Sequence, residues 1–92
     1  MATNNNPNPT STQSQTKKIL AYMKQGYSIT PREARKLCRS DRLGARIMDI
    51  EKIVGYKPPR KRVEVVDYDD DGRPIIKRVM SYWLRDEDIE RN

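Results

Sequence analysis

The segment 29–56 constrains the fold more than any other part of the chain, because it carries the start and stop signals of two adjacent helices. The first helix is predicted over residues 31–38. Thr30 suits the N-cap position, Pro31 the first helical position, and Glu33 lies three residues after the cap. This is a capping box, in which the side chains at the cap and the third position each accept the other's backbone N–H.

A second helix is predicted over residues 41–54. Ser40 can cap it, and Gly55 follows as a C-terminal stop. Its apolar residues recur at the spacing of a helix face that packs on a core: Leu43, Ile47, Ile50 and Val54. About 3–4 residues join the two helices, which is the spacing of a helix-turn-helix.

A further helix is predicted upstream, over residues 15–25, and Gly26 ends it. Its apolar stripe consists of Ile19, Leu20 and Met23. A short extended link then leads to the Thr30 cap. Within that link, Ile29 directly precedes the cap and can pack as a hydrophobic staple.

After the helices the sequence signals become those of β-structure. The prolines at 58–59 forbid helix and favour extended backbone. Strands are predicted over 60–68 and 74–84, with a turn at 69–72 that ends in Asp-Gly. A hairpin that covers the open side of a three-helix core is a winged helix. The predicted fold class is therefore α+β, a winged helix-turn-helix with three helices and a C-terminal hairpin wing.

A length of 92 residues, of which 35% are hydrophobic, allows one small domain, predicted here over residues 14–85. Residues 1–13 are almost free of apolar side chains and are expected to form a disordered arm. Residues 86–92 are expected to form a charged, frayed tail. The chain shows no secretory signal and no apolar run of about 20 residues. With a single cysteine, it is expected to be soluble and cytoplasmic.

Catalytic and metal-binding signatures are absent from the sequence. The chain has no histidine, one cysteine and no glycine-rich phosphate loop, which excludes zinc fingers and Cys/His catalysis. Acidic residues at 67, 69 and 71 match the start of a calcium loop, but Arg78 stands where its final Glu belongs and Pro74 interrupts it. Cys38 is expected to be a small buried hydrophobe. We therefore predict a non-catalytic protein without cofactor, metal or small-molecule substrate.

The positive charge is concentrated on the predicted helices. The net charge is +6, and residues 14–55 alone hold ten Lys and Arg against four Asp and Glu. A basic helix-turn-helix favours a polyanionic partner, and double-stranded DNA is the first hypothesis.

Three motifs resemble a family of short winged helix-turn-helix proteins from bacteria, their phages and mobile elements. The recurring pattern is S-I-T-P-x-E-A, then R-L-x-A-R-I-x-D-L, then G-Y. In this chain it is matched by residues 28–34, by residues 42–50 with Ile50 in place of the final Leu, and by residues 55–56. The resemblance covers roughly residues 15–84. It implies DNA binding in the regulation of transcription or in a phage or mobile-element process such as excision control.

The helix over 41–54 is the predicted recognition helix, placed in a major groove. Opposite its apolar stripe lie Ala45, which is small enough for close approach to a groove, and Lys52. Arg42 lies near the helix start, where such helices address base edges, and is the first candidate for a base or phosphate contact.

Arg46 lies at the edge of the apolar stripe and is open to two interpretations. It can reach a phosphate, or it can pack its stem over the core with Asp49 as its ion-pair partner. Further candidates for backbone contacts surround the second helix and the hairpin: Arg32, Arg35, Lys36, Arg39, Arg60, Arg62 and Lys77.

Other functions are compatible with parts of the sequence. The acidic hairpin tip, residues 67–71, would repel phosphates, so the wing can instead meet a protein partner or a second copy of the chain. Tyr68, Tyr82 and Trp83 could stack on single-stranded nucleic acid, although they are few. The basic run at 57–62 also has the composition of a nuclear-localisation segment.

Overall fold

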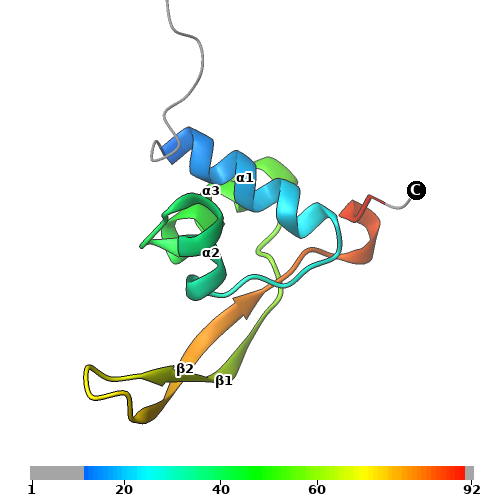
Figure 1. Ribbon diagram of the computed structural model, residues 1–92. Helices are drawn as coiled ribbons and strands as arrows, with labels where there is room; N and C mark the ends of the chain where they lie inside the picture. The colour runs from blue at the N-terminus through cyan, green and yellow to red at the C-terminus, as the bar shows by residue number, and fades with distance from the viewer. Residues whose placement is uncertain (1–11, 91–92) are drawn as a thin grey trace, which may run out of the picture.

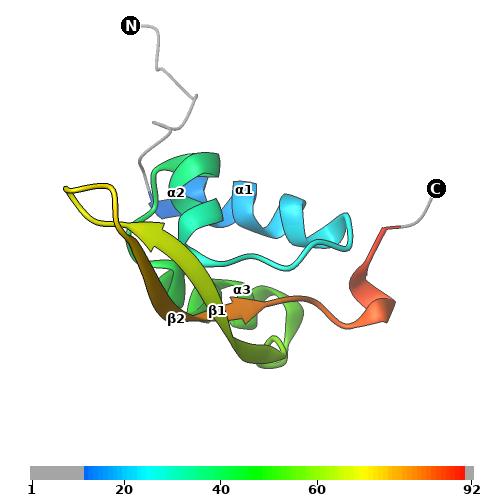
Figure 2. The ribbon, with the colours of Figure 1, turned by 60° about the horizontal axis from the view of Figure 1, so that its bottom comes forward.

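The computed structural model describes residues 12–90, and three helices precede a two-stranded antiparallel hairpin (Figure 1). The helices gather at one side of the molecule, and the hairpin projects from them. A short 3-10 helix, η1, lies on the side away from the hairpin tip (Figures 1 and 2). The elements are α1 (Thr12–Lys24), α2 (Pro31–Cys38), α3 (Leu43–Val54), β1 (Arg60–Tyr68), β2 (Pro74–Tyr82) and η1 (Asp86–Asp88). The predicted winged helix-turn-helix architecture is confirmed.

One hydrophobic core joins the three helices, the link between α1 and α2, and the segment after β2. Its buried residues are Ile19, Met23, Ile29, Ala34, Cys38, Leu43, Ile47, Ile50 and Leu84. The predicted apolar stripe of α3 lies on this core, with Val54 packed at its margin. Burying one such aliphatic side chain completely contributes about 1.5–3 kcal/mol to the free energy of folding. The few buried residues of this core are therefore the main source of the domain's stability.

The local signals around α2 act as predicted. Pro31 is the first helical residue, and Glu33 accepts the backbone N–H of Thr30 at 2.7 Å. The same carboxylate accepts the hydroxyl of Thr30 at 2.7 Å. At the other end Arg39 closes the helix in the left-handed conformation, with φ of 58°. Among residues 12–90 it is the one non-glycine with positive φ.

Helix α3 begins at Leu43, two residues after the predicted start at 41. Arg42 has φ −130° and ψ 59°, which is outside the helical region, and it is the N-cap. Ser40 does not cap the helix directly; its Oγ accepts the N–H of Arg42 at 3.4 Å. Such a bond two residues along the chain is a local turn that competes with helix.

Helix α1 begins at Thr12, three residues before the predicted start. Its first turns are buried through polar rather than apolar residues, which the hydrophobic pattern does not show. Gln15 donates to the carbonyl of Cys38 at 3.3 Å, and the hydroxyl of Thr16 donates to Asp49 at 3.3 Å. Apart from these first helical positions, the predicted arm lies outside the described residues.

The hairpin is regular over its whole length, from the pair Arg60↔Tyr82 to the pair Tyr68↔Pro74. The bounds of β1 are those predicted, whereas β2 ends at Tyr82 rather than at residue 84. At the tip, Asp69 accepts the N–H groups of Asp71 and Arg73 at 2.9 and 2.8 Å, which closes the turn.

The expectation that the hairpin covers the core is wrong for its outer part. β1 alternates between half-buried and exposed side chains from Val63 onward, and its far end carries Tyr68 at 62% exposure. In Figures 1 and 2 the tip extends well beyond the helices. The base is held to the core by the bridge between Ile29 and Tyr82, and the middle of the hairpin meets α2 at Arg32, so only the tip lies free of the helices.

Residues 86–90, the described part of the expected tail, include η1 and contact the rest of the domain. Tyr56 donates its hydroxyl to Asp88 at 2.5 Å and accepts the N–H of Arg85 at 3.1 Å. The guanidinium of Arg85 lies 4.0 Å from the Tyr56 ring centroid. Glu90 donates its N–H to the last carbonyl of α1 at 2.7 Å. These partners, Tyr56 and the end of α1, lie far from the tail in sequence, so the composition of the tail alone does not reveal the contacts that hold it in place.

Candidate nucleic-acid interface

The exposed side of α3 includes a line of three residues that faces away from the core, and Ile53 beside its end is exposed as well. Gly44, Met48 and Lys52 are spaced four apart and are all exposed, Met48 at 64%. A Cβ added at Gly44 would meet nothing within 4 Å, so this part of the helix is open to close approach. The predicted face was centred on Ala45, which is half-buried; the exposed face is centred on its neighbour Gly44 instead.

Arg42 and Arg46 have different environments. Arg42 is exposed at the N-cap of α3. The side chain of Arg46 is only 14% exposed, and its Nε lies 3.3 Å from Asp49 Oδ2 without hydrogen-bond alignment. Because Asp49 also accepts the hydroxyl of Thr16, the pair connects α3 to α1. The geometry supports the structural interpretation of Arg46 and the predicted pairing with Asp49.

A basic hollow lies where the α2–α3 turn meets the start of α1. It is lined by Thr12, Gln15, Arg39, Asp41, Arg42 and Arg46. Arg39 and Arg42 are exposed and Arg46 is not, so the two exposed arginines are the ones available to an anion. The structure thus brings together three predicted site residues that lie on different local elements.

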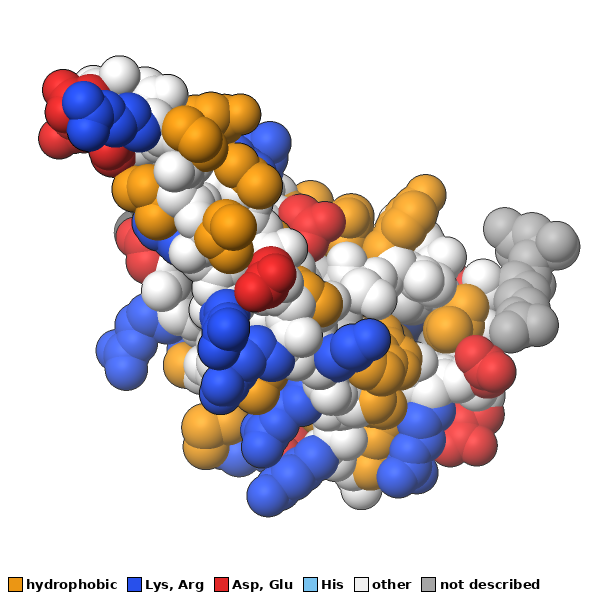
Figure 3. Space-filling model, turned by 90° about the horizontal axis from the view of Figure 1, so that it is seen from below, with side chains coloured by type: hydrophobic (Ala, Val, Ile, Leu, Met, Phe, Trp, Pro, Cys, Tyr) orange, Lys and Arg blue, Asp and Glu red, His pale blue; other side chains and the backbone are white. Residues whose placement is uncertain are grey.

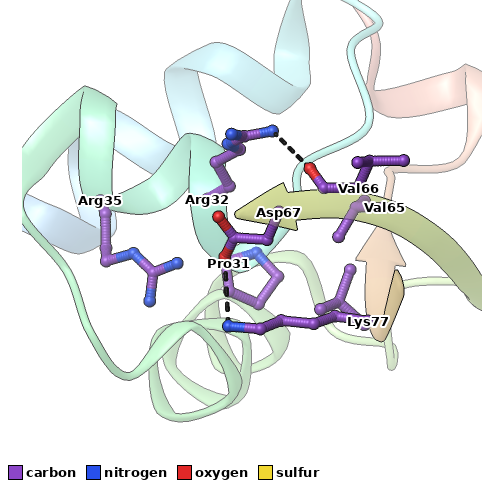
Figure 4. A pocket seen from close by; sticks show the side chains of 8 residues that line it. Pro31, Arg32, Arg35, Val65, Val66, Asp67 and Lys77 are labelled. Carbon is purple, nitrogen blue, oxygen red and sulfur yellow. Dashed lines mark hydrogen bonds and ion pairs between the residues drawn. The ribbon is translucent and has the colours of Figure 1, made fainter. Parts of the chain in front are cut away.

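A second basic site lies in a cleft between α2 and the hairpin (Figure 4). Lys77 Nζ lies 3.1 Å from Asp67 Oδ2, and Arg32 donates to the carbonyl of Val66 at 3.5 Å. In Figure 4, Arg35 extends from α2 beside the cleft, and no dashed line joins it to the other residues drawn. Arg32 and Lys77, both predicted site residues, therefore act on one Asp, and Arg35, a third, lines the same cleft.

The environment of Asp67 keeps its carboxyl ionised. The backbone N–H of Tyr68 and the ammonium of Lys77 lower the pKa of Asp67 below its ordinary value, and Arg32 acts in the same direction. Hydrogen bonds and cations that favour the charged form are the cause of such shifts. Asp67 therefore brings a full negative charge into the cleft.

A groove between α3 and the hairpin base forms the third basic site. Gly44, Met48 and Glu51 line it from α3, and Lys57 and Arg60 line it from the other side, so two cations face one carboxylate. Arg62 follows Arg60 on the same exposed face of β1. Figure 3 shows Lys and Arg side chains gathered over the body of the domain and Asp side chains at the hairpin tip. The hairpin base is thus basic and its tip acidic.

The predicted site residues do not form one continuous patch. Arg60 and Arg62 lie on the outer face of the hairpin and Lys77 on its inner face, so the two sets point to opposite sides. Lys36 is exposed on α2 and lines neither basic hollow described above.

The sequence predictions missed several residues of these sites. Gly44 and Lys57 line the groove beside α3, and Asp67 lies at the centre of the cleft. A signal for Gly44 was present, because it lies four residues before Met48 on the same helix face. The position of Asp67 depends on how the hairpin lies against α2, and no local pattern encodes that.

Cys38 has the environment of a buried hydrophobe, as predicted. It is 3% exposed, and its Sγ donates to the carbonyl of Ala34 at 3.3 Å. Burial raises the pKa of the thiol above its ordinary value, which lowers its reactivity. Within residues 12–90 no group of three or more acidic, Cys or His side chains is placed to hold a metal ion. Nor is any helix of that part long and apolar enough to cross a membrane.

Comparison with known proteins gives one match. The sequence model of the winged helix-turn-helix domain family matches residues 14–86, most of the chain and all of the helices and strands except the first two positions of α1 and the last two of η1. No curated protein and no solved structure matches the chain.

Proposed function

Since this chain belongs to the winged helix-turn-helix family, we propose that it binds double-stranded DNA through α3 as a small, non-catalytic regulator. The processes that fit are transcription and a phage or mobile-element function such as excision control. The family suggests DNA binding in general; the contacting residues and the biological role are part of the proposal.

The exposed face of α3 carries this proposal. Gly44 has no side chain and Met48 is an uncharged, exposed neighbour one turn along, and the adjoining groove is lined by the cations Lys57 and Arg60 together with one carboxylate, Glu51. A helix of 12 residues is about 18 Å long, and a helix fits into a major groove about 12 Å wide. In the proposed complex Gly44 allows α3 to approach the bases closely, while Lys57 and Arg60 contact phosphates at the edge of the major groove.

The remaining cations have positioning roles in this arrangement. Arg42 and Arg39 lie beside the start of α3, and Lys52 lies in its last turn. Contacts of this kind to phosphates fix the register of a protein on the duplex, whereas base contacts specify sequence. We propose that Arg42 contacts either a phosphate or a base, and that Arg46 stabilises α3 through its ion pair with Asp49.

The hairpin tip stays away from phosphates in the proposed complex. Asp70 and Asp71 are exposed there, and Asp69 is engaged in closing the turn. Because like charges repel across a short distance, the tip would oppose insertion into a minor groove. Arg60 and Arg62 at the base of the hairpin, and not the residues of its tip, are the candidate phosphate contacts on its outer face.

The test is the salt dependence of duplex binding by the full chain, measured by fluorescence anisotropy of a labelled duplex. Phosphate neutralisation releases counterions, so the logarithm of affinity should fall linearly with the logarithm of salt, with a slope of about −0.9 for each contact. Binding of four to six phosphates would give a slope of roughly −4 to −5. An absence of binding at low salt to mixed genomic duplexes would refute the proposal.

A second candidate function, protein docking, is favoured by the outer face of the hairpin. Val66, Tyr68 and Ile76 lie there side by side and are 50%, 62% and 68% exposed. Figure 3 shows hydrophobic side chains along the projecting hairpin. Exposed apolar groups in one patch are typical of interaction surfaces. If a second copy of the chain binds there, sedimentation equilibrium should detect a dimer that Ile76→Ser weakens.

A further inference from the structure

The cleft between α2 and the hairpin combines three cations with a single carboxylate. Arg32 comes from the first turn of α2 and Arg35 from its last turn, Lys77 comes from β2, and Asp67 comes from β1 (Figure 4). The four formal charges sum to +2. Among the described residues, no carboxylate other than Asp67 lines this cleft. Its cations therefore outnumber the anion available to them.

The floor of the cleft is apolar, which strengthens interactions at its rim. Pro31, Val65 and Val79 line it, and the hollow measures about 40 Å³. A single water needs about 10–15 Å³, so there is space for more than one small oxygen-bearing group. Charges act more strongly beside a low-dielectric wall than in open solvent.

The contact between Lys77 and Asp67 is an exposed one. The two side chains are 55% and 37% exposed, and they are diagonal neighbours on the inner face of the hairpin. Exposed ion pairs contribute little to stability and exchange readily with other ions. The strand position of Asp67, next to the projecting tip, also lets its side chain turn toward solvent.

From this arrangement we propose that the cleft binds one phosphate of the DNA backbone, held by Arg32, Arg35 and Lys77, and that Asp67 is a resident counter-ion which the phosphate displaces. The proposal rests on the proposed function and adds to it the occupant of this cleft and a residue that opposes binding. A phosphodiester carries the same single charge as the carboxylate and offers two terminal oxygens to the two guanidinium groups.

The duplex can displace Asp67 because the exchange releases counterions. Each phosphate that a cation neutralises frees condensed ions from the DNA, whereas the internal pair of Lys77 and Asp67 frees none. Asp67 then acts as a competitor within the protein. It weakens binding to any duplex and makes the contact of Lys77 conditional on close docking.

The test compares Asp67→Asn with Asp70→Asn, which makes the same change of charge at the exposed tip. Labelled-duplex anisotropy is measured over a salt series, and thermal melting verifies that each variant is folded. Asp67→Asn should bind about threefold to tenfold more tightly at low salt, because the phosphate no longer competes with a carboxylate for Lys77, while the slope should change by less than about 0.3, since the wild-type complex already contains that phosphate contact. Asp70→Asn should change affinity less than about twofold and leave the slope unchanged.

A second pair of variants separates the competitor role from a general change in charge. In a Lys77→Gln background, Asp67→Asn should lose most of its gain, since the cation it would release is gone. Equal gains for Asp67→Asn and Asp70→Asn, or a full gain without Lys77, would overturn the inference while duplex binding by the wild-type chain still supports the proposed function. A wild-type chain that binds no duplex would overturn both.

Discussion

Ile29 and Tyr82 exchange two backbone hydrogen bonds, with N···O distances of 2.8 and 2.9 Å. The first residue lies in the link before α2 and the second at the end of β2. This isolated antiparallel bridge attaches the hairpin base to the link before α2 and, through the buried Ile29, to the helical core. The orientation of the hairpin relative to α2 depends on it, and so do the cleft around Asp67 and the groove beside α3.

The core prediction concerns Ile47, which is 6% exposed at the centre of the α3 stripe. Ile47→Ala should lower the free energy of unfolding by about 2–5 kcal/mol, through reduced burial and the cavity left behind. Urea denaturation measures the change. Ile53→Ala, at a position on the same helix that is 60% exposed, is the matched control and should cost well under half as much. Equal effects at the two positions would show that the helix faces are misassigned.

The hydroxyl of Tyr56 is expected to stabilise the packing of η1 against the domain. Tyr56→Phe removes the bonds to Asp88 and to the N–H of Arg85, and should cost about 1–3 kcal/mol in stability because each bond contributes about 0.5–1.5 kcal/mol. Tyr68→Phe, at an exposed hairpin position, should be nearly neutral. Faster amide hydrogen exchange in residues 85–90 should accompany the first change only. No change in exchange would mean that η1 is held without Tyr56.

Because the Cys38 thiol is buried, we expect the free energy of unfolding to decrease at alkaline pH. Burial raises the pKa of the folded thiol above its ordinary value of 9.0, so the unfolded chain loses its proton first as the pH rises. The stabilisation is complete below pH 9 and decreases as the pH rises from 9 toward the folded pKa. Urea midpoints between pH 7 and 10 measure it, with Cys38→Ala as the control that removes this titration. A midpoint that falls equally in both proteins would assign the effect to other groups.

Local sequence signals were sufficient for most of the fold. The Thr30–Glu33 pair starts α2, the spacing from Leu43 to Val54 defines the buried face of α3, and Asp-Gly marks the hairpin turn. Each of these acts over a few residues, so the chain specifies it without its tertiary neighbours.

The features that sequence reasoning missed depend on contacts between distant segments. Ser40 has the residue type of an N-cap, but its side chain bonds to the N–H of Arg42 and forms a turn, so α3 begins only at Leu43. Tyr56 and Asp88 hold a tail whose own composition suggests fraying. For the candidate interface, most of the lysines and arginines that line it could be identified from the sequence. It could not show that Lys77 and Arg60 lie on opposite faces of the hairpin, or that Asp67 lies among the cleft cations.

The last prediction tests α3 as the DNA-facing helix. Arg42 lies at its N-cap and Lys52 in its last turn, and both side chains are exposed. Replacing both with Ala should leave the far-UV spectrum and thermal midpoint nearly unchanged, because neither belongs to the core. Duplex affinity should fall, and the salt slope should become shallower by about 0.9 for each phosphate that the variant no longer neutralises. If Arg42 reads a base, Arg42→Ala alone should cost about 1–3 kcal/mol on the preferred sequence and relax the choice at one position.

Arg73→Ala is the matched control for this experiment, since Arg73 is an exposed arginine at the acidic hairpin tip whose backbone N–H keeps its bond to Asp69. It removes a positive charge without touching α3, and its effect on the slope should be smaller than about 0.3 if the tip stays off the duplex. A double variant of Arg42 and Lys52 that binds with unchanged affinity and slope would contradict DNA binding through α3. The exposed apolar face of Val66 and Ile76 would then be the better guide to what this domain binds.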